Sequence, residues 1–171
     1  MSTATATTNV AQTPEQEVRA LFEKWLAAVR SHDVDAIMSC YAPDVVAFDA
    51  ILALQFKGAD SYGKHWRACL DMCTGPMVFE IRELNVEAGE DVAFAHWLNR
   101  CGGTDEKGEE KSSWMRVTAG YRRIKGSWRI VHEHFSACWS SPPSRSRIRC
   151  CSRRRSPSSA SACSRRCRPG A

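Results

Sequence analysis

The segment with the most evident chemical potential is Trp128-Arg-Ile-Val-His-Glu-His-Phe-Ser136, which follows the turn pair Lys125-Gly126. Side chains alternate across a β-strand with a period of two, so a strand here places every second residue on one face: Trp128, Ile130, His132 and His134. Two imidazoles on a face that begins with large apolar groups need a partner, a ligand or bound water. We therefore expect this strand to line a pocket, with His132 and His134 as candidate catalytic residues.

A carboxylate at the end of another predicted strand could work with these imidazoles. Asp49 follows the short apolar run Val45–Phe48, and a carboxylate at a cavity wall can act as a general base. The alternative is an aspartate that only caps the loop after the strand. Asp49 could also join the His-x-His pair as a third metal ligand, but no second paired-ligand motif accompanies it, so we expect no metal.

Six further residues are candidates for contact with a substrate. They are aromatic or polar side chains on predicted helices and strands: Trp25, Tyr41, Trp66, His96, Arg116 and Thr118. Each has a structural alternative. The aromatic residues could belong to the core, His96 could be a satisfied core histidine, and Arg116 could pair with Asp49 or Glu133. Glycine-rich phosphate loops, nucleophile elbows and Cys-x-x-Cys motifs are not found in the sequence, so we expect no cofactor.

The periodicity of the chain predicts three helices followed by strands. Thr13 is the N-cap of a helix of about four turns, Asp33 can cap a short second helix, and Ala59–Met72 is a third. Four strand-like runs then follow Thr74-Gly75-Pro76: Met77–Ala88, Val92–Cys101, Ser112–Ile124 and Trp128–Ser136. Helices followed by an antiparallel meander indicate an α+β fold, in which a curved sheet of four long strands and one short strand wraps over three helices.

Composition divides the chain into three parts. Residues 1–12 are small and polar and are expected to be disordered, residues 13–137 form the predicted domain, and residues 138–171 are rich in Arg, Ser and Cys. The last segment holds nine Arg and no Lys, Asp or Glu, so the net charge of +5 leaves about −4 on residues 1–137. Its residue usage indicates out-of-frame translation after a frameshift in a GC-rich gene. The alternative is a tail that binds nucleic acid, although the acidic body shows no basic surface for this purpose.

The sequence also bears on the compartment in which the protein acts. The nine cysteines form no regular disulfide framework, and the first residues lack a basic region followed by an apolar one. No apolar run approaches the length that spans a membrane. These features predict a soluble cytoplasmic protein that does not bind membranes.

Four segments of the chain carry a resemblance to a known group of proteins. They are Phe56-Lys-Gly-Ala-Asp60, Asp91-Val-Ala-Phe-Ala-His96, Arg116-Val-Thr118 and Gly126-Ser-Trp-Arg-Ile-Val-His-Glu-His-Phe-Ser136. With the predicted order of elements, they resemble the SnoaL-like and ketosteroid-isomerase-like families of the nuclear-transport-factor-two-like superfamily. The resemblance covers roughly residues 14–136. It implies a cone-shaped fold with a cavity for a hydrophobic small molecule, and commonly a homodimer.

The resemblance also implies roles for particular residues. The base of the steroid isomerases corresponds to Asp49, whereas their tyrosine corresponds to Trp25 and their acid falls near Thr118-Ala119, which has no carboxyl group. We therefore expect a domain that binds a hydrophobic carbonyl compound and acts on it by proton transfer, as an isomerase or cyclase does. A non-catalytic dimerisation or ligand-sensing module, or a metal-dependent enzyme that uses the His-x-His pair, are the alternatives.

Overall fold

The structure, a computed structural model, describes residues 12–72, 76–104 and 108–137. The predictions for residues 1–11 and for the Arg-rich segment 138–171 lie outside these residues. Within the described part, no helix is both long enough and apolar enough to cross a membrane.

The three predicted helices are confirmed. They are α1 (Pro14–Arg30), α2 (Val34–Met38) and α3 (Ala59–Asp71). The capping box at the start of α1 has both of its hydrogen bonds, because the Thr13 hydroxyl accepts the Gln16 N–H at 3.3 Å and the Gln16 side chain accepts the Thr13 N–H at 2.9 Å. Asp33 caps α2 in the same way, by accepting the Ala36 N–H at 2.9 Å.

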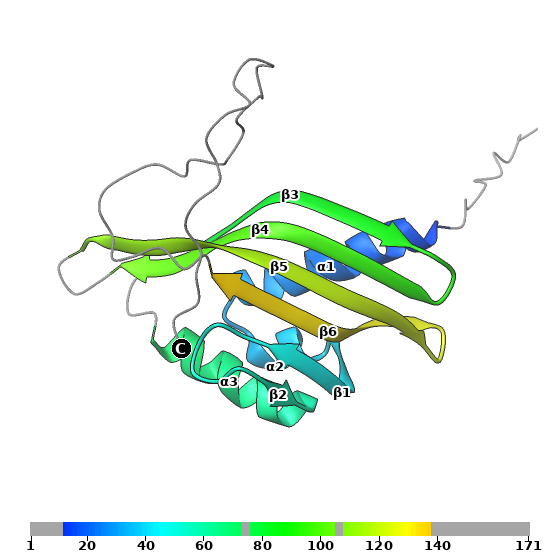
Figure 1. Cartoon of the computed structure of the whole chain (residues 1–171), viewed down its shortest axis with the longest axis horizontal. Helices are drawn as coiled ribbons and strands as arrows, with labels where there is room; N and C mark the ends of the chain where they lie inside the picture. Colours follow the sequence, from blue (N-terminus) through cyan, green and yellow to red (C-terminus); the bar gives the residue numbers. More distant parts are fainter. Residues whose placement is uncertain (1–11, 73–75, 105–107, 138–171) are drawn as a thin grey trace, which may run out of the picture. The chain divides into compact units, whose positions relative to one another are not determined.

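The six strands form one curved sheet that the helices cover on one side (Figure 1). They are β1 (Tyr41–Phe48), β2 (Phe56–Lys57), β3 (Val78–Ala88), β4 (Val92–Thr104), β5 (Glu110–Ile124) and β6 (Ser127–Ala137). Their order across the sheet is β2-β1-β6-β5-β4-β3, and every neighbouring pair is antiparallel except β1 and β6. The α+β fold class is thus confirmed. The sequence did not predict β2 or the parallel pair, and β1 begins before the predicted strand.

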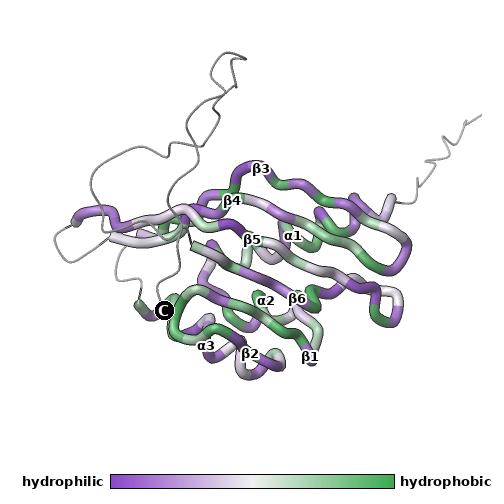
Figure 2. Tube along the Cα trace, viewed as in Figure 1, coloured by the Kyte–Doolittle hydropathy of each residue, from purple (hydrophilic) through white to green (hydrophobic). Residues whose placement is uncertain are grey.

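The core lies between the sheet and the helices and is built around one tryptophan. The Trp25 ring on α1 packs against four other aromatic rings, with centroid distances between 5.6 and 6.0 Å: Phe22, Trp66, Phe79 and Trp97. Figure 2 shows the hydrophobic and hydrophilic residues that alternate along the long strands, as expected for a sheet with one covered face. The aromatic packing holds α1 and α3 over the sheet.

A polar contact at the start of α1 attaches that helix to the β5–β6 hairpin. The Glu17 carboxylate accepts a hydrogen bond from the Trp128 indole N–H at 2.9 Å and pairs with Arg123. These two donors hold the pKa of Glu17 below its usual value. The Arg123 guanidinium also lies 4.7 Å from the centroid of the Trp128 ring. The hairpin itself turns through Lys125 and Gly126, both of which have positive φ, as the predicted turn requires.

A β-bulge changes the side-chain alternation halfway along β6. Tyr121 of β5 pairs with Ile130, but the preceding Gly120 pairs with His132, so Val131 has no partner on β5. Trp128 and Ile130 are buried before the bulge, and Glu133 and Phe135 are buried after it. The prediction that Trp128, Ile130, His132 and His134 share one face is therefore wrong beyond Ile130. The inserted residue turns the two histidines to the outer face of the sheet.

Candidate functional site

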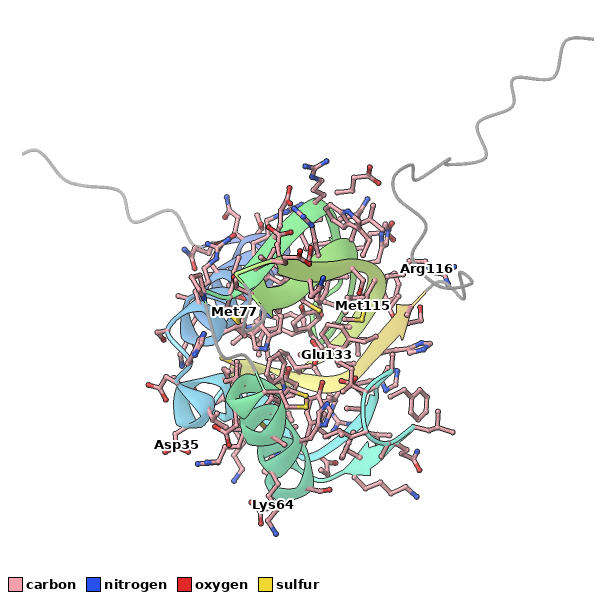
Figure 3. The ribbon with its side chains drawn as sticks, turned by 90° about the vertical axis from the view of Figure 1, so that its left-hand side faces the viewer. Asp35, Lys64, Met77, Met115, Arg116 and Glu133 are labelled. Atoms are coloured by element: carbon pink, nitrogen blue, oxygen red, sulfur yellow. The ribbon has the colours of Figure 1, made fainter. Side chains whose placement is uncertain are left out.

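A cavity of about 460 Å³ lies between α3 and the concave face of the sheet. Most of its lining is apolar, and five polar side chains interrupt it. The residues come from the loop after β1, from α3 and from strands β3 to β6: Asp49, Ile51, His65, Trp66, Cys69, Leu70, Met72, Met77, Phe79, Asn99, Cys101, Gly102, Gly103, Thr104, Lys111, Met115 and Phe135. In Figure 3, Met77 and Met115 lie between the sheet and α3, whereas Arg116 points away from this space.

Gly102 shapes the part of the cavity that β4 and β5 form. A Cβ atom at this position would lie 2.0 Å from the Lys111 carbonyl oxygen and 2.6 Å from the Ser112 Cα, and neither backbone atom can move aside cheaply. The absence of a side chain lets the two strands approach closely here.

The most distinctive polar feature of the cavity is the pair formed by Asp49 and His65. His65 Nε2 lies 3.1 Å from Asp49 Oδ2, and the two side chains are only 3% and 8% exposed, respectively. The second oxygen of Asp49 accepts the Ile51 backbone N–H at 3.0 Å. Asp49 therefore closes the turn after β1 and contacts an imidazole at the same time. The loop-capping role that the sequence left as an alternative is real, and it coexists with a place in the cavity wall.

His65 is held in a fixed orientation by its surroundings. Its ring stacks on Phe56 of β2, with centroids 4.2 Å apart, and lies 5.7 Å from the Tyr62 ring, one turn earlier on α3. Cys69, one turn later, places its Sγ atom 3.6 Å from Nε2 and 3.8 Å from Nδ1 of the imidazole. The short strand β2 thus positions the stacking partner of the histidine. A rigid imidazole between a carboxylate and a thiol is suited to moving protons.

Two further polar groups of the cavity lining have no hydrogen-bond partner among the described residues. Asn99 is fully buried on β4, yet neither its Nδ2 nor its Oδ1 is bonded, and the indole N–H of Trp66 is buried without an acceptor. Buried polar groups are normally satisfied, because leaving one unpaired costs about 1–3 kcal/mol. Both residues border the cavity, but these polar atoms are themselves buried, so a ligand could bond to them only after the side chains shift.

A second buried carboxyl group lies deeper in the core. Glu133 on β6 accepts hydrogen bonds through Oε2 from the Tyr41 hydroxyl at 2.6 Å and the Tyr62 hydroxyl at 2.9 Å, and the Trp25 indole donates to Tyr41 at 3.0 Å. Its Oε1 has no partner among the described residues. Burial raises the pKa of Glu133 to about 7, although the two phenols oppose the shift, and the Asp49 charge adds to it. The pKa values of both phenols lie well above normal, first because of burial and then because of the Glu133 charge.

The structure brings together only some of the residues that the sequence singled out. Asp49 and Trp66 line the cavity. Trp25 and Tyr41 lie beneath it, in the network around Glu133, and not in its described lining. The remaining five predicted residues lie on the outer face of the sheet and do not contact Asp49. On this face His96, Arg116 and His134 are exposed, and Thr118 and His132 are half-buried. His132 Nδ1 donates a hydrogen bond to the Val46 carbonyl oxygen at 2.8 Å, and Arg116 forms no pair with Asp49 or Glu133 in the described part of the chain.

Sequence reasoning missed two residues that line the cavity, His65 and Asn99, and the buried Glu133 beneath it. His65 follows Tyr62 by three positions and precedes Cys69 by four, so its spacing places it on one face of α3 with these two residues. Asn99 alternates with Ala93, Ala95 and Trp97, which form the buried face of β4, and the opposite face is also apolar because it carries Phe94 and Leu98. Glu133 could not be placed without knowing the bulge.

No three described His, Cys, Asp or Glu side chains gather closely enough to hold a metal ion. His132 and His134 in particular have no third ligand beside them in residues 12–72, 76–104 and 108–137.

Comparisons with known proteins agree with this architecture. A family model described as a SnoaL-like domain matches residues 18–140, which is more than half of the chain. An NTF2-like protein of unknown function from Pseudomonas putida KT2440 is 53% identical, with a TM-score of 0.68, over 75% of this chain and 89% of that one. Comparison with curated proteins gives no significant match.

Two more distant structures share the fold. A ketosteroid isomerase-like protein from Erwinia carotovora atroseptica has a TM-score of 0.63 at 19% identity, over 75% of this chain and 98% of that one. The association domain of CaMKII from C. elegans has a TM-score of 0.58 at 18% identity, over 71% of this chain and 94% of that one. The match to the family model and the similarity to the Pseudomonas protein show that the chain belongs to the SnoaL-like family.

Proposed function

We propose that the cavity binds a compact, mostly apolar carbonyl compound and that the Asp49–His65 pair transfers a proton to and from it. The observation that carries this proposal is the contact of 3.1 Å between two almost fully buried, titratable side chains in the wall of a largely apolar cavity. Apolar cavities with a few convergent polar groups are the usual form of small-molecule sites. The SnoaL-like fold supports the same class of function.

The geometry suggests a division of labour among the cavity residues. Asp49 is the base, since each carboxylate oxygen has a second lone pair beyond the one that His65 or Ile51 uses. His65 keeps the carboxylate in place and takes part in the movement of the proton. The Asn99 amide and the Trp66 indole, which are buried beside the cavity without a partner among the described residues, become donors for a carbonyl oxygen that gains negative charge once the side chains shift to reach it. His132 and His134, the catalytic candidates from the sequence, lie on the other face of the sheet.

Exchange of substrate protons with solvent tests this proposal. The protein would be incubated in D₂O with alicyclic ketones from cyclohexanone to decalone, and deuterium uptake next to the carbonyl would be followed by mass spectrometry. We expect Asp49→Asn to lower the exchange rate by at least about a hundredfold while ketone binding persists, since a positioned base contributes about that much.

The matched control is Asp44→Asn, which removes a solvent-exposed carboxylate from β1, the strand that precedes Asp49. This variant should exchange at the wild-type rate. Exchange that is equal in wild type and Asp49→Asn, with binding intact in both, would show that the site binds ligands without the proposed catalysis. It would favour the sensing module.

A homodimer formed through the outer face of the sheet is a second, separate proposal. This face exposes large apolar side chains, with Val92 66%, Phe94 47% and Phe48 38% exposed. Phe94 stands opposite Gly120 of β5, which has no side chain to cover its ring. A second copy of the chain would cover these groups. The likeness to an association domain agrees with an oligomeric role for this fold.

A further inference from the structure

The connection between β1 and β2 is an apolar loop that is largely exposed to solvent. Residues 50–54 read Ala-Ile-Leu-Ala-Leu, five apolar residues in succession, and Ile51 alone among them is partly buried. Leu52 is 68% exposed and Leu54 is 86% exposed. Surface loops are normally polar, and a continuous apolar run on the surface usually has a binding role. This segment therefore calls for an apolar surface that covers it.

Both ends of the loop are attached to residues of the cavity. At its start, Asp49 and Ile51 line the cavity. At its end, Phe56 pairs with Ala47 of β1 and stacks on the ring of His65, which also lines the cavity. A segment that is held at both ends on the cavity wall can cover the cavity through a local change in its backbone.

Few contacts hold the loop between these two ends. Among the described residues, segment 50–55 has two hydrogen bonds, and both are local. The Ile51 N–H donates to the Asp49 carboxylate at 3.0 Å, and the Ala53 N–H donates to the Ile51 carbonyl oxygen at 2.8 Å. Neither bond joins the loop to a helix or a strand. Segments with few buried contacts change conformation at low cost in free energy.

The turn at the centre of the loop is strained. Leu52 has a φ of +64°, in the left-handed region that L side chains rarely adopt. The hydrogen bond from Ala53 to Ile51 spans this residue, so the three residues form a γ-turn of the rare type with positive φ. Strained residues of this kind gather at ligand clamps and switch regions, because new contacts there can release the strain.

A second segment also leaves apolar surface in solvent beside the cavity. Met72, directly after α3, lines the cavity and is 56% exposed. Most of the cavity lining is apolar, so an apolar ligand in the cavity would extend this surface. Moving the two exposed leucines onto the ligand removes apolar area from water, which is favourable.

We propose that segment 50–55 is a lid that folds over the cavity when an apolar ligand is bound and brings Leu52 and Leu54 against the ligand. The γ-turn at Leu52 opens in this step, and both leucine side chains leave water. The inference rests on the proposed binding of a compact carbonyl compound. It adds to that function two residues that determine how tightly the compound is held.

Nuclear Overhauser contacts between ligand and methyl groups test the closure on the unaltered protein. The full chain, with isotope-labelled Leu and Met methyl groups, would be saturated with decalone. We expect contacts from decalone to the methyl group of Met115, inside the cavity, and to those of Leu52 and Leu54. Contacts to Met115 without any to the two leucines would overturn the lid and sustain the proposed binding. Contacts to none of the three residues would refute both.

Variants at the two leucines test the contribution of the lid to affinity, and they should fold because these side chains are exposed. We expect Leu52→Ser and Leu54→Ser each to weaken decalone binding about fivefold in titration calorimetry. Val92→Ser is the matched control, since Val92 is 66% exposed on the outer face of the sheet, and it should bind decalone as the wild type does. Leucine variants that bind as tightly as the wild type would overturn the proposal.

A further pair of variants isolates the strain at Leu52. Leu52→Ala and Leu52→Gly both remove most of the side chain, but glycine adopts a positive φ without strain and so stabilises the open loop. We expect Leu52→Gly to bind decalone about threefold more weakly than Leu52→Ala. Equal affinities of these two variants would overturn the role given to the strained turn.

Discussion

Glu133 shows how a single buried side chain couples this fold to pH. Its carboxyl group is 1% exposed and is held by the Tyr41 and Tyr62 hydroxyls, and its pKa is about 7 in the folded state against 4.5 for the free side chain. The folded protein therefore binds a proton that the unfolded chain releases between these two values. Stability must fall as pH rises from about 4.5 to about 7, by on the order of 3 kcal/mol, and then level off.

Replacing the Glu133 carboxyl by a neutral amide should remove this dependence of stability on pH. We expect Glu133→Gln to have little effect on the free energy of unfolding near pH 4.5 and to be the more stable protein by about 2–3 kcal/mol at pH 8, because Gln cannot ionise in the core. Urea denaturation at the two pH values measures this difference. Glu87→Gln, on the exposed side of β3, is the control and should shift stability equally at both. A Glu133→Gln variant that loses stability as steeply as wild type above pH 5 would contradict the account.

Among individual residues, Asp49 could be predicted from the sequence and its partner His65 was overlooked. A carboxylate that ends a short apolar strand is conspicuous by itself, whereas spacing places His65 only on a helix face, and its fixed orientation depends on Phe56, which stacks on its ring. Phe56 comes from β2, a two-residue strand too short to show any periodicity. The site thus depends on a contact between distant segments that no local pattern contains.

The bulge in β6 decides which side chains face the cavity. If β6 included Val131 in a regular strand without a bulge, period-two alternation would carry His132 and His134 inward and Glu133 and Phe135 outward. One inserted residue reverses this arrangement for the second half of the strand. Existence and order of the long strands were predictable because their alternation is strong, but a single inserted residue leaves no distinct mark in the sequence.

Substitutions on either side of the bulge test this arrangement directly. Phe135 is buried in the cavity wall, so Phe135→Ala should lower the free energy of unfolding by about 3 kcal/mol or more. His134 is exposed on the outer face, so His134→Ala should change it by less than about 0.5 kcal/mol. Chemical denaturation gives both values. The reverse order would mean that the histidines, and not Phe135, face the interior.

At the level of the complete domain, the two faces of the sheet carry different kinds of side chain. The concave face carries the core and the cavity, and the convex face carries the exposed aromatic side chains together with His96, His132 and His134. The sequence predicted a curved sheet over three helices because its elements occur in that order. It could not assign the faces of β4 and β6, since the exposed face of β4 is as apolar as the buried one.

The outer face should hold two copies of the chain together. We expect sedimentation velocity to show a dimer for the wild type and a monomer for Phe94→Glu, because a charge within the proposed interface would have to be buried without a partner. Leu54→Glu alters another exposed apolar side chain, in the loop after β1, and should leave the dimer intact. A wild-type monomer, or a Phe94→Glu dimer, would refute the proposed interface.

The most direct test of whether the cavity binds a carbonyl compound uses the polar groups that lack a hydrogen-bond partner, because the ligand would become that partner. Nuclear magnetic resonance can follow the side-chain amide signals of Asn99 and the indole N–H signal of Trp66 as decalone is added. We predict saturable shifts of these signals, while the indole signal of Trp128, already bonded to Glu17, stays in place. If the Asn99 and Trp66 signals do not move as decalone is added, decalone binds elsewhere or not at all, and the cavity is not the binding site that the account requires.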